Sequence, residues 1–246
     1  MRWPRRWAED GCLFEREHHR RIALVLQALD PAVLATHRCL FGGGTAIALR
    51  YGEFRESVDI DFLVADADGY RALRQLLGGP AGLAPLVRAG LTLELAREVR
   101  TDQYGIRTVV RTEGVGIKFE IVREARITLE MPGPQDVVCG VPTLTPLDLA
   151  ASKLLANADR WGDDSVFSRD LIDLAMMAPS PALLVQARDK AEQAYGSSVR
   201  ESVHKAVEAL RRRPQRLDEC LKALRVQGVS KAGMLQRIRN LERKLR

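Results

Sequence analysis

The chain has 246 residues, of which 46% are hydrophobic and 28% are charged, and its formal net charge is +6. This length can bury a core in one large domain or two smaller ones, and the composition excludes a disordered or fibrous chain. The four scattered cysteines form no C-x-x-C pair and the histidines form no H-E-x-x-H motif, which argues against a zinc site and a disulfide scaffold.

The positive charge is concentrated at the C-terminal end. Residues 181–246 contain 16 Lys+Arg and 7 Asp+Glu, a net charge of +9, whereas residues 1–180 contain 22 and 25, a net charge of −3. Such asymmetry is typical of a segment that meets a polyanion, most often a nucleic acid. The alternative is a set of solvated, arginine-rich helix faces.

The N-terminal stretch, residues 1–7, is basic, but the acids Glu9 and Asp10 follow it without an apolar run long enough for a signal peptide. No stretch approaches the ~20 apolar residues that a membrane span needs. We therefore expect a soluble, cytoplasmic protein that does not bind a membrane.

The periodicity of the apolar residues predicts an N-terminal α/β part and a helical remainder. In the first part, helices are expected over 14–29, from Thr45 onward and over 70–77, and strands over 57–64, 91–99, 106–112, 115–123 and within 137–143. In the second part, helices are expected over 145–156, 169–177, 181–194, 199–212, 215–226 and 231–245. The sequence thus predicts an α+β fold with a domain of residues 1–144 and a helical domain of residues 145–246.

A triple glycine, Gly42-Gly43-Gly44, leads into the helix expected at Thr45. Glycine lets the backbone approach a ligand closely, and a helix N-terminus offers unpaired N–H groups to an anion. Gly43, Gly44 and Thr45 are therefore candidates for binding the phosphates of a nucleotide. A simple turn is the alternative.

Two aspartates follow in the next predicted strand. Side chains alternate along a strand, so Asp59 and Asp61 are expected on one face, about 7 Å apart along the backbone. Carboxylates on one face can hold divalent metal ions such as Mg²⁺ or Mn²⁺. On the predicted strand 115–123, Glu120 is a candidate third carboxylate. An exposed strand edge is the alternative, but a buried strand seldom keeps two acids without a partner or a metal ion.

These motifs resemble the nucleotidyltransferases of the DNA polymerase β superfamily, in which a glycine turn and a short helix precede a D-x-D strand. More closely, Gly43-Gly44-Thr45-Ala46 with Arg55-x-Ser57-x-Asp59-x-Asp61 resembles the AbiEii/AbiGii toxin-like family. Later family features are similar too: a lysine-bearing helix at 152–156 and Arg169-Asp170-Leu171-x-Asp173-Leu174. The resembling region spans residues 42–174. It departs from the family at Gly42, where relatives often have a long side chain.

The resemblance implies a polymerase-β-like mixed sheet with flanking helices and a helical C-terminal domain. It implies that Ser57, Asp59 and Asp61 form the catalytic strand, that Lys153 contacts a nucleoside triphosphate (NTP), and that Asp170 is a further required acid. It also implies nucleotide transfer to RNA, notably to the acceptor end of tRNA, and an antitoxin partner encoded nearby. The position of a third carboxylate varies in the superfamily, so Glu120 is carried over less firmly.

Each of these side chains also has an ordinary structural interpretation. Lys153 in an apolar helix would extend its ammonium group to the surface. Asp170 would form an intrahelical pair with Arg169 or favour the helix N-terminus, and Ser57 would cap a turn. The conjunction of the motifs favours the enzyme.

Three functions follow, of which the first is favoured. It is a metal-dependent nucleotidyltransferase toxin that modifies RNA, with pyrophosphate release and a block of translation, and whose basic C-terminal helices bind the RNA. The second transfers the nucleotide to a protein hydroxyl or a small molecule. The third is a non-catalytic nucleotide-binding protein. The sequence leaves the preferred nucleotide and the oligomeric state open.

Overall fold

A computed structural model describes residues 14–245. The predictions for residues 1–7, for Glu9 and Asp10, and for Cys12 lie outside this range. The chain divides into two compact units: one contains residues up to Leu49 and Ser57–Leu144, and the other contains Arg50–Glu56 and the residues from Thr145 onward. The short segment Arg50–Glu56 thus groups with the C-terminal helices.

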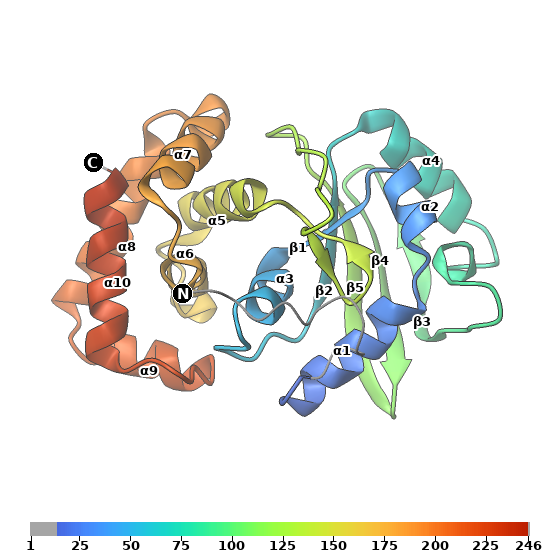
Figure 1. Cartoon of the computed structure of the whole chain (residues 1–246), viewed down its shortest axis with the longest axis horizontal. Coiled ribbons are helices and arrows are strands. Elements are labelled where there is room, and N and C mark those ends of the chain that lie inside the picture. Colours follow the sequence, from blue (N-terminus) through green and yellow to red (C-terminus); the bar gives the residue numbers. More distant parts are fainter. Residues whose placement is uncertain (1–13, 246) are drawn as a thin grey trace. The chain divides into compact units, whose positions relative to one another are not determined.

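The first unit is a mixed sheet with helices against it (Figure 1). Its elements are α1 (Glu17–Ala28), α2 (Pro31–Thr36), β1 (Leu40–Gly42), α3 (Gly43–Arg50, whose last residue groups with the second unit), β2 (Ile60–Val64), α4 (Ala67–Leu77), the short 3-10 helix η1 (Ala84–Leu86), β3 (Glu94–Thr101), β4 (Gly105–Thr112), β5 (Val115–Arg123), β6 (Val137–Val138) and β7 (Val141–Pro142).

The strand order in the five-stranded sheet is β1-β2-β5-β4-β3, in which only β2 and β5 pair in parallel. Alternate residues of β4 and β5 are buried, and the rings of Phe41, Phe62 and Phe119 pack in a row across β1, β2 and β5 with neighbouring centroids 5.5 Å apart. Helix α1 packs on β4, and α4 packs on β2 and β3. One face of the sheet therefore forms the core of this unit.

The elements α2, β1 and η1 of this unit were not predicted. After the predicted helix 14–29, a new short helix, α2, begins at Pro31, because the Asp30 carboxylate accepts from Ala32 N at 2.8 Å and proline suits the first helical position. The run before the glycines is strand β1, which pairs antiparallel with β2. It is too short for its periodicity to be read in the sequence.

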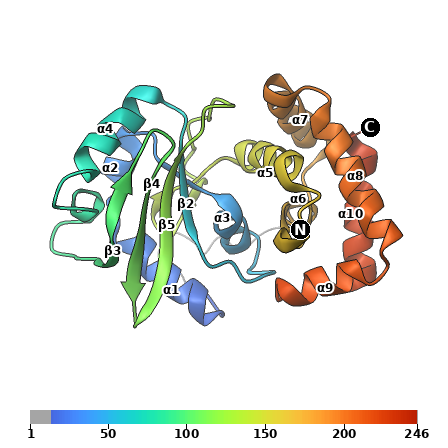
Figure 2. The same cartoon turned by 180° about the vertical axis from the view of Figure 1, so that it is seen from behind.

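In the part that the structure describes, up to Leu245, the second unit contains only helices besides Arg50–Glu56 and its loops (Figure 2). Its elements are α5 (Pro146–Arg160), the 3-10 helix η2 (Asp164–Val166), α6 (Arg169–Met177), α7 (Pro181–Tyr195), α8 (Ser198–Arg212), α9 (Arg216–Ala223) and α10 (Lys231–Leu245). Thr145 caps α5 by accepting from Asp148 N at 3.2 Å, as its sequence predicts. Helix α5 packs against α6, α7 and α8, and α8 lies beside α10.

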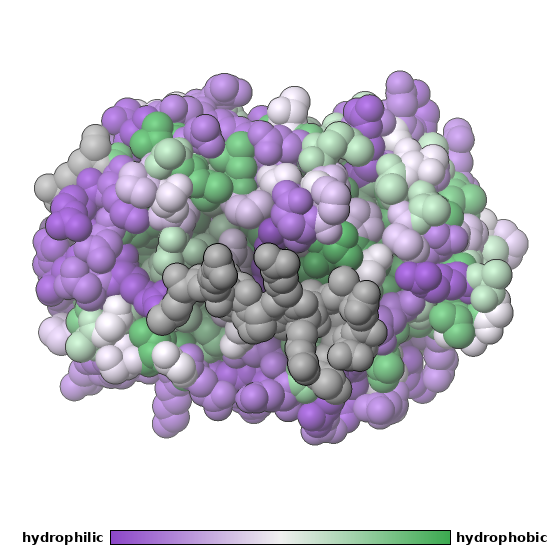
Figure 3. Space-filling model, in the orientation of Figure 1, coloured by the Kyte–Doolittle hydropathy of each residue, from purple (hydrophilic) through white to green (hydrophobic). Residues whose placement is uncertain are grey.

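The expected α+β class, with a mixed sheet, flanking helices and a helical C-terminal part, is confirmed. Among residues 14–245 no helix is both long and apolar enough to cross a bilayer. Hydrophilic residues cover most of the surface seen in Figure 3. Cys39, Cys139 and Cys220 are buried, and none of these three takes part in a disulfide.

Candidate functional site

The glycine turn and the first aspartates meet in the first unit. Strand β1 pairs with β2 so that Gly42 lies opposite Asp61, and α3 begins at the next residue, Gly43. The backbone of Gly43 has φ +68°, and a Cβ there would lie 2.5 Å from Asp61 Oδ2. Because any side chain would displace the carboxylate, only glycine lets Asp61 lie against the start of α3.

Gly42 is constrained differently. A Cβ there would lie 2.6 Å from Leu63 Cδ1 and 2.8 Å from Leu144 Cδ1. Both leucines belong to the apolar core. The long residue that relatives often have at this position would therefore need different packing here.

A hydroxyl of α3 fixes the residues before β2. Thr45 Oγ1 lies 2.5 Å from the Asp59 carbonyl oxygen and 2.8 Å from Ser57 Oγ. Because a carbonyl only accepts, the single hydroxyl hydrogen of Thr45 points to Asp59, and Ser57 Oγ donates to Thr45. This contact occupies the Asp59 carbonyl just before β2 starts at Ile60, so the ladder is shorter than the predicted strand 57–64.

Two histidines of α1 hold the same segment. The fully buried His19 accepts the Ser57 N–H at Nε2 (3.1 Å), and His18 Nε2 lies 3.0 Å from the Val58 carbonyl oxygen. The first contact requires an unprotonated His19 Nε2, and the second requires a proton on His18 Nε2. Sequence reasoning missed both roles, since their partners are about 40 residues away.

Glu120 lies on β5 directly beside Asp61 of β2. Its carboxylate accepts from Lys118 Nζ at 2.6 Å and from Arg107 Nε at 3.1 Å. Burial by itself would lower the pKa of Lys118. The hydrogen bond and charge of Glu120 and the charges of Asp59 and Asp61 outweigh this effect, so the pKa is raised above its ordinary value and the ammonium group stays protonated. Glu120 is therefore near Asp61 but already engaged by two cations.

The donor set fits a hard divalent ion. Asp59 and Asp61 offer carboxylate oxygens from neighbouring positions, and Mg²⁺ is usually bound by one or two carboxylates together with substrate phosphates and water. Among residues 14–245 no group of three or more His, Cys, Asp or Glu side chains is arranged to hold a metal ion. Such an ion would thus depend on oxygens that the nucleotide and water supply.

The later motifs form a buried ion network in the helical unit. Arg55 donates Nε and Nη2 to the two oxygens of Asp173 at 2.6 and 2.9 Å, a bidentate pair with almost no exposure. Lys153 Nζ lies between two carboxylates, 2.7 Å from Asp173 and 2.8 Å from Asp170. Lys153 is buried. Its ammonium group therefore does not extend to the surface, contrary to the ordinary structural interpretation of this residue.

Asp170 is the second centre of this network. Arg160 donates Nε and Nη2 to it at 2.7 and 3.0 Å, and the Arg160 side chain is 34% exposed. Burial of Asp170 would raise its pKa, but the charges of Lys153 and Arg160 and their hydrogen bonds hold it well below the ordinary value. The network contains three cations and two carboxylates, and Arg160 is the member that solvent reaches most easily.

The structure brings the predicted residues together in two sets. Gly43, Gly44, Thr45, Ser57, Asp59, Asp61 and Glu120 gather in the first unit, and Lys153 and Asp170 bind each other in the second. Arg55 and Asp173, which belong to the motifs of the family resemblance but were not among the predicted site residues, link Arg50–Glu56 to helix α6 within the second unit. The R-x-S-x-D-x-D spacing was the signal that pointed to Arg55.

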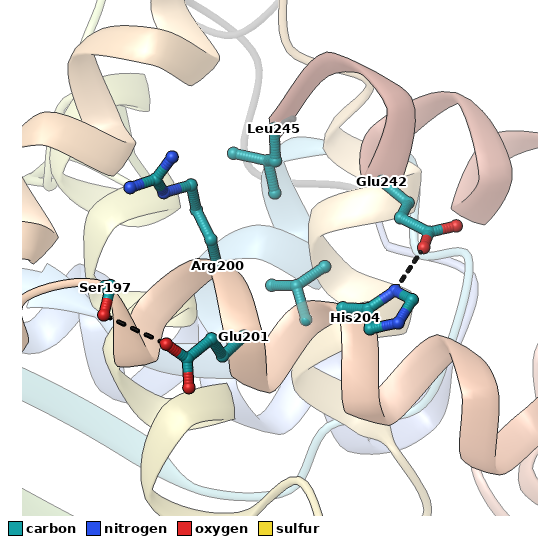
Figure 4. A pocket seen from close by; sticks show the side chains of 7 residues that line it. Ser197, Arg200, Glu201, His204, Glu242 and Leu245 are labelled. Carbon is teal, nitrogen blue, oxygen red and sulfur yellow. Dashed lines mark hydrogen bonds and ion pairs between the residues drawn. The ribbon is translucent and has the colours of Figure 1, made fainter.

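The helical unit also has a cavity of about 440 Å³ between α8 and α10 (Figure 4). Inside it Ser197 donates to Glu201 at 3.0 Å, and His204 Nδ1 lies 2.8 Å from Glu242. Its lining includes none of the residues that the sequence predicts for the site.

Replacement of Gly43 tests the contact with Asp61. Gly43→Ala should lower the free energy of unfolding by about 1–2 kcal/mol for the left-handed backbone and by about 1 kcal/mol more for the displaced carboxylate. Gly52→Ala is the control, because Gly52 also has a positive φ (+84°) but no atom lies within 4 Å of its added Cβ. Chemical denaturation measures both, and equal losses would contradict the proposed contact.

His19 should matter as a hydrogen-bond acceptor. His19→Leu leaves the Ser57 N–H without its partner, which should cost about 1–3 kcal/mol and lower nucleotidyl transfer. His19→Gln keeps an oxygen at the position of Nε2 and should restore most of both quantities. The idea fails if the glutamine variant is as unstable and as inactive as the leucine variant.

Asp170→Asn should destabilise the protein by about 3 kcal/mol near neutral pH, because it leaves two buried or half-buried cations with less compensation. The pKa of Asp170 is depressed in the folded state, so its contribution exists above the unfolded pKa and disappears as the pH falls through the folded value. The difference from wild type in urea titrations should therefore shrink below about pH 4.

The matched control is Asp218→Asn, since Asp218 pairs with Lys231 at the surface with 55% of its side chain exposed. An exposed pair contributes about 0–1 kcal/mol. A similar loss in both variants, or a difference that does not change with pH, would argue against a buried network.

Comparison with known proteins gives one family match. The model of the family described as nucleotidyl transferase AbiEii toxin of the type IV toxin–antitoxin system matches residues 24–240. No curated protein matches the chain. Among solved structures, a Helicobacter pylori protein described as a candidate nucleotidyltransferase is 18% identical, with 95% of this chain and 97% of that chain covered and a TM-score of 0.48. JHP933 from Helicobacter pylori is 17% identical, with 95% of each chain covered and the same TM-score of 0.48.

The family match includes the glycine turn, the aspartate strand and the ion network, and it extends over most of the chain. The enzyme is a nucleotidyltransferase, and the chain belongs to the AbiEii family of toxins of type IV toxin–antitoxin systems.

Proposed function

We propose that this nucleotidyltransferase moves a nucleoside monophosphate from an NTP to an RNA acceptor, the 3′ end of tRNA, and thereby blocks translation. The observation that carries the proposal is the contact between Gly43 and Asp61. It puts a carboxylate beside the N-terminus of α3, where backbone N–H groups favour an anion. Phosphate binding and metal binding would thus take place within one turn of helix.

At the α-phosphorus the reaction forms one bond and breaks one, and the acceptor hydroxyl loses its proton to solvent. The acceptor hydroxyl oxygen attacks the α-phosphorus of the NTP, the bond from that phosphorus to the bridging oxygen breaks, and pyrophosphate leaves while the hydroxyl proton is released. A divalent ion, Mg²⁺ or Mn²⁺, would neutralise charge on the phosphates when it is bound. Asp59 and Asp61 would hold it, and Glu120, already engaged by Lys118 and Arg107, would act as a ligand only if it gave up one of these partners.

The residues around the carboxylates would orient the nucleotide. The backbone of Gly43 and Gly44 would approach the phosphates, and Thr45 would keep Ser57 and Asp59 in place through its hydroxyl. Rotation about the C–O bond of Ser57 would redirect its hydroxyl from Thr45 to a phosphate oxygen. This assigns Ser57 to substrate contact and Thr45 to positioning.

We keep Lys153 as the nucleotide contact and Asp170 as the required acid. In the helical unit both belong to the buried network, which has one more cation than carboxylates. A triphosphate would compensate that excess charge. Substitution of either residue should therefore affect stability as well as transfer, and the two effects must be measured separately.

The basic helices support RNA as the acceptor. Several exposed cations of α8, α9 and α10 have no carboxylate partner among residues 14–245: Lys205, Arg212, Lys222, Arg237 and Arg239. Cations of this kind favour contact with a phosphate backbone. The family implies an antitoxin partner, which we expect to be encoded beside this chain.

Transfer can be measured with each α-³²P-labelled nucleotide, total RNA and Mg²⁺. We expect one nucleotide to label a small RNA, and Asp59→Asn to reduce the labelling by roughly a hundredfold or more, because the loss of a metal ligand costs several kcal/mol. Chelation of the metal should do the same.

The control is Asp68→Asn, since Asp68 is 84% exposed and, among residues 14–245, its ion-pair partner is the exposed Arg71 on α4. It should label RNA as the wild type does. A label found on protein or on a small molecule would show that RNA is not the acceptor. If no nucleotide is transferred at all, the proposal is contradicted.

A further inference from the structure

One face of strands β3, β4 and β5 is open to solvent. On this face the side chains of Lys118 and Arg107 are 52% and 41% exposed, while the alternate residues Ile117 and Phe119 are fully buried. Helices α1 and α4 pack on the sheet without covering these cations. The open face is therefore a free surface of the first unit.

The strand register arranges charges in rows across this face. Asp61 of β2 lies beside Glu120 of β5, Glu120 beside Arg107 of β4, and Arg107 beside Arg100 of β3. Directly paired residues share a face of the sheet. A row of side chains therefore leads from the catalytic strand to the edge strand.

A second row runs parallel to the first. Lys118 of β5 is paired with Val109 of β4, which is paired with Arg97 of β3. A third pair, Arg111 with Glu94, completes the face. It carries five cations and two carboxylates on β3, β4 and β5.

The cations of the first row lie at increasing distances from Asp61. Neighbouring strands lie about 4.8 Å apart, so Arg107 is about 10 Å and Arg100 about 14 Å from Asp61 at the level of the backbone. Arg107 and Lys118 bind Glu120, and Arg111 binds Glu94. Neither Arg97 nor Arg100 has a carboxylate partner among residues 14–245.

The turn that joins β3 and β4 carries an exposed aromatic side chain, three residues before Arg107 of the first row. Tyr104, in the turn between β3 and β4, is 66% exposed. Its neighbour Asp102 accepts from Arg107 at 2.8 Å. Cations with an exposed aromatic ring are the usual elements of a surface that binds single-stranded nucleic acid, because bases of any sequence stack on the ring.

We propose that the open face of β3, β4 and β5 binds the single-stranded 3′ end of the acceptor RNA, with Arg97 and Arg100 on its phosphates and Tyr104 against a base. The inference rests on the proposed function for the identity of the acceptor. It adds a second RNA-binding surface, besides the C-terminal helices, that leads to Asp61 within the same unit. An acidic protein would use the cations but would not need the ring.

Binding of a short 5′-labelled single-stranded oligoribonucleotide, measured by fluorescence anisotropy over a range of salt concentrations, tests this surface. Arg97→Gln with Arg100→Gln should weaken binding roughly tenfold at moderate salt and reduce the slope of log K against log salt by about 1.4, because each phosphate contact on a single strand contributes about 0.7.

The matched control is Arg38→Gln with Arg74→Gln. Both arginines are exposed, and neither has a carboxylate partner among residues 14–245. Arg38 follows α2, and Arg74 lies in α4. The control removes the same charge and should leave the affinity and the salt slope unchanged. An equal loss in both double variants, or no loss in the sheet variant, overturns the proposal.

Tyr104→Ala distinguishes a nucleic acid from other polyanions. It should weaken binding roughly fivefold or more without changing the salt slope, because stacking releases no counterions. An unchanged affinity would overturn the assignment to a single strand.

The binding measurements separate this inference from the proposed function. Labelling of RNA together with no effect of the Arg97 and Arg100 substitutions would reject only the surface. Loss of binding in these variants, in an enzyme that labels no RNA, would support the surface and reject the proposed acceptor reaction. Thermal unfolding midpoints equal to that of the wild type establish that the variants are folded.

Discussion

The structure of the site depends on the absence of one side chain. At Gly43 a Cβ would lie 2.5 Å from a carboxylate oxygen of Asp61, and the backbone has the positive φ that glycine adopts at little cost. Since α3 follows β1 without a loop, the close approach brings a helix N-terminus and the carboxylate of Asp61, the proposed metal ligand, together. The hydroxyl of Thr45, two residues after Gly43, then fixes Ser57 and Asp59.

Lys153 and Asp170, which the family resemblance implies in catalysis, also stabilise the helical unit. The ammonium group of Lys153 forms ion pairs with Asp170 and Asp173, and Asp173 also forms an ion pair with Arg55. Burying such charges is favourable only when each has its partner, so the members of the network depend on one another. Arg55 belongs to the segment that directly precedes Ser57, and the network therefore anchors one end of that segment.

The net charge of a stretch of sequence does not show where its charged residues lie in the structure. Residues 1–180 carry a net charge of −3, yet the same region contains an open sheet face with five cations. Because acidic residues elsewhere in the region outnumber the basic ones, the net charge of residues 1–180 does not indicate that this face is basic. Strand register decides which charges are neighbours, because it puts residues from β2, β5, β4 and β3 in one row.

The sequence by itself determined the fold class, the order of most elements and the candidate residues of the strand site. These follow from local rules: apolar periodicity, the cap and proline at 145–146, and the spacing from Gly43 to Asp61. Only the tertiary structure decided what these residues contact. The support of Ser57 by His19, the bidentate pair of Arg55 with Asp173 and the row from Asp61 to Arg100 join residues 38, 118 and 39 positions apart. Contacts over such distances leave no periodic signal in the sequence, because they depend on how helices pack and how strands align.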